Sequence, residues 1–272
     1  MKRAWKIAGA LAVVALISLG IREFRHHRLT RAEDTARQDA TIARFMEMLT
    51  KDPRARLEET RVAVHDAAAL VDEGVRQAEP YYAEGLLLHS QEQYSKAVVS
   101  YERAIFLKPT WSWPHIGRGI SLHMLERNDE AFQAFQNAIR LAPTDPRPHD
   151  DLAILFRRLG RFEEAEKEAQ IALQLGPNEI SSHNNFGNLL LALGKYAEAE
   201  EAYRKAIAMD PTHPTPYYNL ACVSAKQGKA AEAVEYLKQA FELDPAFHAE
   251  AKYDPDFELI KEDPAFKALF GD

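Results

Sequence analysis

The sequence AEKEAQIALQLGP, residues 165–177, contains three positions that recur along the chain at intervals of 34 residues. Its first alanine belongs to one series, the alanine seven residues later to a second, and the final proline to a third. The members are Ala97, Ala131, Ala165, Ala199 and Ala233; Ala104, Ala138, Ala172, Ala206 and Ala240; and Pro109, Pro143, Pro177, Pro211 and Pro245. A constant period over five units predicts a repeat protein, in which each unit buries its apolar face against its neighbours.

Two further positions carry matching residues in every unit. With the proline at position 32, the units are 78–111, 112–145, 146–179, 180–213 and 214–247. Position 8 is small (Gly85, Gly119, Ala153, Gly187, Ala221), and position 24 is mainly aromatic (Tyr101, Phe135, Ala169, Tyr203, Leu237). A small residue at position 8 lets the two helices of a unit approach closely. A proline opens the leading helix in four units, and Gly160, Gly194 and Gly228 are predicted to end it in the last three.

This pattern resembles the tetratricopeptide repeat family. The resemblance covers residues 78–247 and implies an all-α, right-handed solenoid of helix hairpins that binds other proteins. We expect the leading helices to line its concave groove, as they do in that family.

The net charge of −7 is unevenly distributed. Residues 1–50 contain nine Lys/Arg and five Asp/Glu, a charge of +4, which leaves −11 for the rest. An acidic solenoid is poorly suited to phosphate backbones, so we expect no nucleic acid partner. The single cysteine, Cys222, excludes an internal disulfide and a zinc site built from several thiolates.

The N-terminus reads as a membrane anchor. A basic leader precedes an apolar run over residues 7–21, and four arginines follow it, which favours an uncleaved transmembrane or signal-anchor helix within 1–28. A signal peptide cleaved near Gly20, which would release a secreted solenoid, is the alternative. The short basic leader favours a cytoplasmic N-terminus and a solenoid on the non-cytoplasmic side.

The regions flanking the repeats are also predicted to be helical. Residues 29–77 have helical apolar spacing interrupted at Asp52-Pro53, typical of a linker or a degenerate capping hairpin. Residues 248–272 contain two Asp-Pro steps, each expected to start a short helix of a C-terminal cap. Its expected apolar face is Phe257, Leu259, Ile260, Phe266, Leu269 and Phe270. A docking peptide for a partner is the alternative.

The sequence contains no recognisable motif of a catalytic or metal site. Three histidines in register, His115, His149 and His183, occupy the column where the family has a bulky aromatic residue. Successive units are displaced by about 8–10 Å, which is too far for one ion to bind all three side chains. Phosphate loops, nucleophile elbows and paired-carboxylate motifs are not recognisable. We therefore expect no enzyme activity, no cofactor and no metal.

The family resemblance assigns a peptide-binding role to residues of the groove. The predicted set is Tyr82, Leu86, Ile116, Ile120, Met124, Ile154, Arg157, Arg158, Asn184, Asn185, Asn188, Tyr218, Asn219 and Lys226. Asn185 and Asn219 share one position, where a side-chain amide pairs with both N–H and C=O of an extended chain. They resemble the asparagine ladder of the O-linked N-acetylglucosamine transferase repeats, although Asp151 stands at the preceding rung. We expect both amides to point into solvent.

These observations predict a membrane-anchored scaffold that binds a protein or peptide partner in the concave groove and supports assembly of an envelope or membrane complex. A non-catalytic accessory or adaptor subunit of an envelope enzyme is the alternative, besides the secreted form.

Overall fold

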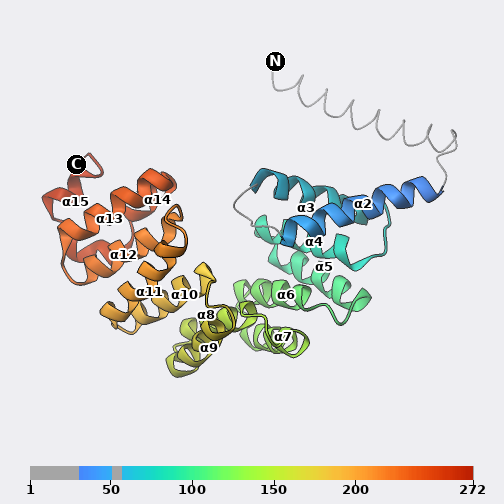
Figure 1. Cartoon of the computed structure of the whole chain (residues 1–272), viewed down its shortest axis with the longest axis horizontal. Helices are drawn as coiled ribbons and strands as arrows, with labels where there is room; N and C mark the ends of the chain where they lie inside the picture. Colours follow the sequence, from blue (N-terminus) through green and yellow to red (C-terminus); the bar gives the residue numbers. More distant parts are fainter. Residues whose placement is uncertain (1–30, 51–56, 272) are drawn as a thin grey trace, which may run out of the picture. The chain divides into compact units, whose positions relative to one another are not determined.

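The structure, a computed structural model, describes residues 31–50 and 57–271 (Figure 1). These residues form α-helices and one 3-10 helix, and they divide into two compact units, the first ending at Leu107 and the second beginning at Lys108. The predicted anchor at 7–21 and the Asp52-Pro53 break lie outside the described residues. Within the described part, no helix combines the length and apolar character needed to span a bilayer.

The first unit contains four helices. They are α2 (Arg31–Thr50), α3 (Leu57–Asp72), α4 (Ala78–Ser90) and α5 (Tyr94–Leu107). Each helix packs against the next, and α2 also contacts α4. Ile42 and Phe45 of α2 are buried, and Ile42 packs with Leu70 and Val75, so these two residues form the core face of α2.

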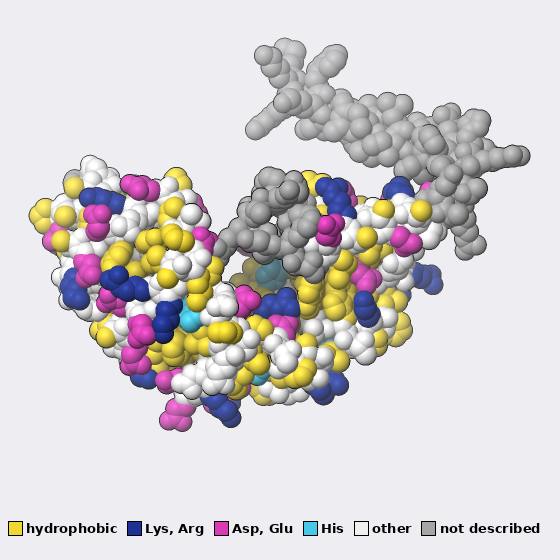
Figure 2. Space-filling model, viewed as in Figure 1, with side chains coloured by type: hydrophobic (Ala, Val, Ile, Leu, Met, Phe, Trp, Pro, Cys, Tyr) yellow, Lys and Arg dark blue, Asp and Glu magenta, His cyan; other side chains and the backbone are white. Residues whose placement is uncertain are grey.

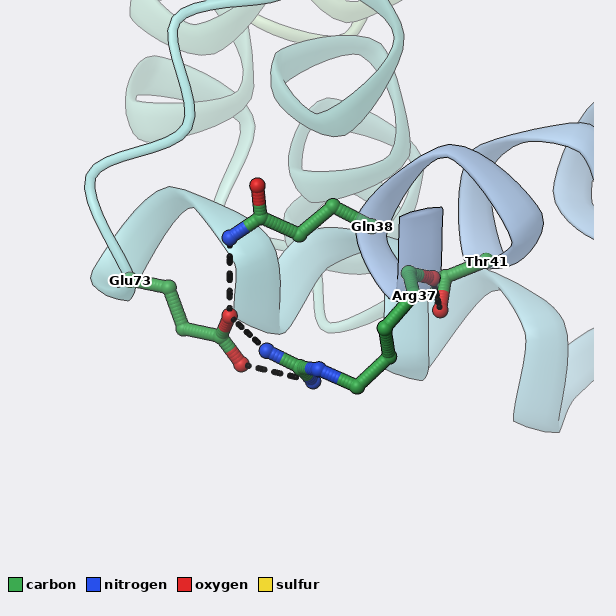
Figure 3. Close-up of polar contacts among 4 residues, drawn as sticks. All are labelled: Arg37, Gln38, Thr41 and Glu73. Atoms are coloured by element: carbon green, nitrogen blue, oxygen red, sulfur yellow. Dashed lines mark hydrogen bonds and ion pairs between the residues drawn. The ribbon is translucent and has the colours of Figure 1, made fainter. Parts of the chain in front are cut away.

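An exposed polar contact links α2 to the end of α3 (Figure 3). The Nη2 atom of Arg37 lies 2.6 Å from Oε2 of Glu73, and Gln38 donates to the same oxygen at 3.4 Å. On α2 itself, the hydroxyl of Thr41 donates to the carbonyl of Arg37. Both members of the ion pair are more than a third exposed, so solvent screening keeps its net contribution to about 0–1 kcal/mol.

The second unit contains four consecutive helix hairpins. The pairs are α6 (Ser112–Met124) with α7 (Asn128–Leu141), α8 (Arg147–Arg158) with α9 (Phe162–Leu175), α10 (Ile180–Ala192) with α11 (Tyr196–Met209), and α12 (Pro214–Lys226) with α13 (Ala230–Leu243). The first helices contact one another in the order α6, α8, α10, α12. Each of α7, α9 and α11 contacts the first helix of the next hairpin. This stacking confirms the predicted all-α helix-hairpin solenoid.

The position-8 glycines are explained by aromatic rings on the partner helix. A Cβ atom on Gly85, Gly119 or Gly187 would lie 2.4–2.5 Å from a ring carbon of Tyr101, Phe135 or Tyr203, respectively. Both alanine series are fully buried beside these contacts. Where position 8 is alanine, the partner at position 24 is not aromatic: Ala153 is matched with Ala169, and Ala221 with Leu237. Each hairpin is therefore closely packed by its own pair.

The turn inside each hairpin contains a residue with left-handed backbone geometry. Gly160, Gly194 and Gly228 have φ angles of 71–72°, as predicted for residues that end the first helix. The equivalent residues of the first two repeats are Glu92 and Glu126, both with φ of 60°. A side chain in this conformation costs about 1–2 kcal/mol relative to glycine.

Three short helices follow the last hairpin. They are α14 (Ala246–Ala251), the 3-10 helix η1 (Pro255–Ile260) and α15 (Pro264–Ala268). Asp254 and Asp263 cap the last two by accepting from the backbone N–H two residues later, at 2.8 Å. Phe257, Ile260 and Phe266 are buried in the core of the last repeat. Leu259, by contrast, is 70% exposed, so its expected place on the apolar face is wrong. Phe257 and Ile260 are three residues apart and share the buried face of the 3-10 helix, so Leu259 lies off that face.

Candidate functional site

Two of the predicted groove residues belong to the first unit. Tyr82 is only 8% exposed, and its ring lies between those of Phe45 on α2 and Tyr101 on α5, with centroids 6.2 Å and 5.8 Å away. Tyr82 is therefore a core residue that joins α2 to α4. Leu86 is partly buried.

All other predicted groove residues lie on the first helices of the second unit. Ile116 and Tyr218 are buried, so they support the surface from beneath. Met124 and Arg158 are exposed, and the remaining residues are partly exposed. The partly exposed set is Ile120, Ile154, Arg157, Asn184, Asn185, Asn188, Asn219 and Lys226. On the face shown in Figure 2, basic and acidic side chains of the described residues are intermixed, so this face has no patch of a single sign.

A pocket of about 830 Å³ lies at the C-terminal end of this surface. Arg157 of α8 and Asn188 of α10 line one side, and Tyr218, Asn219, Cys222 and Lys226 of α12 line another. The segment after the last hairpin completes the wall with Phe247, Glu250, Asp254 and Asp256. This arrangement brings five predicted groove residues together around one cavity.

Two of those five residues are bonded to the C-terminal segment. The hydroxyl of Tyr218 donates to Oδ2 of Asp254 at 2.6 Å, and Nζ of Lys226 lies 2.8 Å from Oδ1 of Asp256. Burial and then the Asp254 contact raise the pKa of Tyr218, and the bond to Asp256 raises the pKa of Lys226. Burial also raises the pKa of the Cys222 thiol, which is therefore unreactive near neutral pH. At this end the C-terminal segment therefore forms part of the pocket wall.

The asparagines differ in their remaining bonding capacity. Asn219 donates through Nδ2 to Oδ1 of Asn184 at 2.8 Å, a contact from α12 to α10. The expectation that Asn219 projects freely into solvent is therefore wrong, because its neighbour on the adjacent helix lies within bonding distance. Asn188 accepts from the Tyr203 hydroxyl at 2.8 Å, which leaves its amide hydrogens for another group. The part of the chain that the structure describes offers no hydrogen bond to the Asn185 side chain.

The two arginines at the end of α8 are held differently. Arg158 donates to Nε2 of His123 on α6 at 3.0 Å, and Nδ1 of His123 lies 3.1 Å from Oδ1 of Asn128. Because arginine only donates, His123 is neutral and its proton is on Nδ1. Burial, with a smaller effect of Arg158, lowers the pKa of His123. Arg157 forms no ion pair with any described residue and lines the pocket.

Two adjacent aspartates, Asp150 and Asp151, lie near the start of α8. Asp150 is 6% exposed and accepts from the hydroxyl of Ser182 on α10, while its Oδ1 is buried without a partner. Burial raises the pKa of Asp150 to about 6. Asp151 is partly buried, and burial together with the charge of Asp150 raises its pKa to about 8. Both carboxyls therefore titrate far above their ordinary range.

The three histidines in register have separate surroundings. Nδ1 of His149 lies 2.6 Å from Oε2 of Glu168, and Nε2 of His183 lies 3.0 Å from the carbonyl of Pro177. Nε2 of His115 is buried without a partner, and burial lowers its pKa. No cluster of metal-ligating side chains occurs among the described residues.

Residues of the C-terminal segment were not in the predicted site. Glu250, Asp254 and Asp256 contribute to the pocket wall, although they lie beyond the last repeat. The Asp-Pro steps in the sequence predict where short helices begin. They do not predict that Asp254 and Asp256 contact α12.

The repeats match models of known families over part of their length. Residues 78–110 and 214–247 match a tetratricopeptide repeat model, and residues 187–228 match a second model described as TPR repeat. No curated protein matches the sequence.

Several solved structures have a similar fold. The APC/C hetero-tetramer Cut9-Hcn1 is 17% identical with a TM-score of 0.61, over 86% of this chain and 54% of that one. TTC0263, a thermophilic TPR protein of Thermus thermophilus, is 18% identical with a TM-score of 0.58, over 71% and 98%. YrrB, a TPR protein with an unusual peptide-binding site, is 24% identical with a TM-score of 0.45, over 68% and 97%.

The matched segments 78–110 and 214–247 coincide with the units 78–111 and 214–247. The third segment, 187–228, begins within α10 and ends just after α12. With this fold and these matches, the chain contains tetratricopeptide repeats over residues 78–110 and 187–247.

Proposed function

We propose that this chain is a membrane-anchored scaffold that binds an extended or short helical segment of a partner protein along α8, α10 and α12. The observation that carries the proposal is the polar pocket of about 830 Å³, where Arg157 and the amide of Asn188 retain donors for a partner. The side-chain oxygen of Asn219 lies in the same pocket, and Asn185 extends the hydrogen-bonding groups beyond it. A concave site with a few convergent polar groups is the usual form of a binding site.

The anchor and the location rest on the sequence. The apolar run at 7–21 supports attachment to a bilayer, with the repeats on the non-cytoplasmic side. Attachment raises the local concentration of bound partners at the membrane, which suits an assembly role. A mature chain that begins near residue 21, or one released by high salt alone, would contradict the anchored form and favour a secreted one.

A second role is that of an accessory or adaptor subunit of an envelope enzyme. The Cut9-Hcn1 structure has the same fold within a hetero-tetramer, so the architecture is compatible with a place in a multi-protein complex. Activity that co-purifies with the chain but is absent from the isolated chain would favour this role.

The test is capture of partners by the full chain in detergent, followed by comparison of variants against the captured protein. The double variant Asn185→Ala with Asn219→Ala should bind at least tenfold more weakly, since an amide left unpaired costs about 1–3 kcal/mol. Gln170→Ala, which removes an exposed amide from the outer helix α9, is the matched control and should bind normally. Equal binding by the double variant and the parent would place the interaction elsewhere.

A further inference from the structure

Asp151 occupies the same position of its repeat as Asn185 and Asn219 occupy in the next two. These three residues lie on α8, α10 and α12, which pack in succession within one unit. Side-chain bonds join the same helices, from Ser182 to Asp150 and from Asn219 to Asn184. Asp151, Asn185 and Asn219 therefore occupy equivalent positions on three first helices that pack in succession.

We propose that Asp151 is a third rung of this ladder and carries a proton when it binds a partner, so that its carboxyl pairs with the partner main chain as an amide does. This inference rests on the proposed function, whose site it extends by one repeat. A protonated carboxyl has one O–H donor and a carbonyl acceptor, the same complement that an asparagine amide offers to a peptide unit. An ionised carboxylate has acceptors only and would repel the main-chain carbonyl.

The surroundings of Asp151 favour the protonated form. Asp150 precedes it, is 6% exposed and has an oxygen without a partner. Asp145 adds negative charge and is itself ion-paired with Arg147, the basic group that opposes the effect on Asp151. Two carboxylates in one partly buried site do not both ionise readily, and burial raises the pKa of Asp151 to about 8.

Among residues 31–50 and 57–271, no charged group of a neighbouring helix forms an ion pair with Asp151. On α9, Glu168 is held by His149, and at the start of α10, Glu179 adds negative charge near Asp150. On α6, Arg118 is paired with Glu130 of α7 at 3.7 Å. A bound proton therefore neutralises the Asp151 carboxyl, as a paired cation would otherwise do.

The first experiment measures the proton directly in the full chain in detergent. With ¹³C-labelled aspartate, the carboxyl signal that disappears in Asp151→Asn should titrate with a midpoint near 8, and in Asp145→Asn the midpoint should fall. A midpoint near the ordinary aspartate value of about 4 would overturn the inference and leave the groove proposal intact.

The second experiment measures binding with uncharged probes, namely acetylated and amidated octapeptides of serine, threonine and valine. The parent should bind at least tenfold more tightly at about pH 6.5 than at about pH 9.5, and Asp151→Asn should bind equally at both. Asp151→Ala should be weaker at the lower pH. Identical pH profiles for the parent and Asp151→Asn would overturn the third rung. Failure of every probe to bind the parent and Asp151→Asn at both pH values would overturn the groove proposal and this inference together.

Discussion

The Cα atom of Gly187 faces the ring of Tyr203 so closely that a Cβ atom would lie 2.5 Å from the ring carbon Cε1. Gly187→Ala should therefore lower the free energy of unfolding by about 1–3 kcal/mol, the usual effect of overfilling a packed core. Denaturant unfolding of the variant and the parent measures this change in the free energy of unfolding. In the last repeat, Ala221 is matched with Leu237, so adding Tyr203→Leu to Gly187→Ala should recover part of the loss. If the two changes are simply additive, the steric explanation fails.

The left-handed turn residue gives a stabilising prediction. Glu126 has φ of 60°, where glycine is favoured, and its equivalent in the next repeat is Gly160. Glu126→Gly should raise stability by about 1 kcal/mol, and Gly160→Glu should lower it by a similar amount. Thermal unfolding of the two variants and the parent gives the comparison. A lower melting temperature for Glu126→Gly would show that the glutamate side chain contributes a contact that outweighs the strain.

Deletion of residues 255–272 should destabilise the last repeat. Phe257, Ile260 and Phe266 are buried in its core, and each large apolar side chain contributes about 1.5–3 kcal/mol. We expect a loss of several kcal/mol and reduced solubility, measured by melting temperature and light scattering. Leu259→Ser is the control, because its side chain is exposed and its loss should change neither. An unaltered melting temperature after the deletion would contradict the capping role and favour a docking peptide.

The aspartates of α8 should make stability depend on pH. Their pKa values, about 6 for Asp150 and about 8 for Asp151, exceed the ordinary value, so the folded state binds more protons than the unfolded state. Stability should therefore fall as pH rises from about 4 to 8 through these two groups. Exposed glutamates with lowered pKa values, such as Glu164 and Glu201, act in the opposite sense below this window.

Asp151→Asn isolates one of these contributions. It removes the cost of ionising Asp151, so the variant should gain stability over the parent by about 1 kcal/mol or more at about pH 9, since one pKa unit corresponds to about 1.4 kcal/mol. Near the ordinary aspartate pKa of about 4 the two proteins should be equally stable. Denaturant unfolding at both pH values checks this, and a gain that is the same at both would exclude an ionisation effect.

Arg157 and Arg158 should affect binding through different routes. Arg157→Gln removes a pocket cation that has no ion pair among the described residues, so partner association should slow and lose part of its salt dependence. Arg158→Gln breaks the contact to neutral His123, and burial lowers the pKa of that histidine, so the effect of the variant should diminish only in acid, where the parent's own histidine protonates. Association rates at two salt concentrations and two pH values separate the two. Salt dependence identical to the parent in Arg157→Gln would exclude an acidic partner at this position.

The repeat period predicted the hairpins and turn positions because these depend on local sequence. The same residue types at a spacing of 34 give the same helix starts, left-handed turns and helix pairing. The two units with alanine instead of glycine at position 8, Ala153 and Ala221, are also the units that lack an aromatic residue at position 24. This pairing can be seen in the sequence alone.

The site was less predictable because it depends on contacts outside the repeat register. Tyr82 is covered by α2, a helix without repeat positions, and Lys226 is bonded to Asp256 beyond the last repeat. The bond from Asn219 to Asn184 depends on the rotation of neighbouring helices, which the spacing of residues along one helix does not specify.

The segment after the last repeat also limits growth of the array. Phe257 and Ile260 fill the apolar end of α12 and α13, the place where a sixth hairpin would stack. A second copy of the chain therefore finds no matching surface there, and head-to-tail filaments, which need an open complementary end on every subunit, are blocked at this terminus. Within the described residues, the stacking of helix hairpins therefore ends at α13.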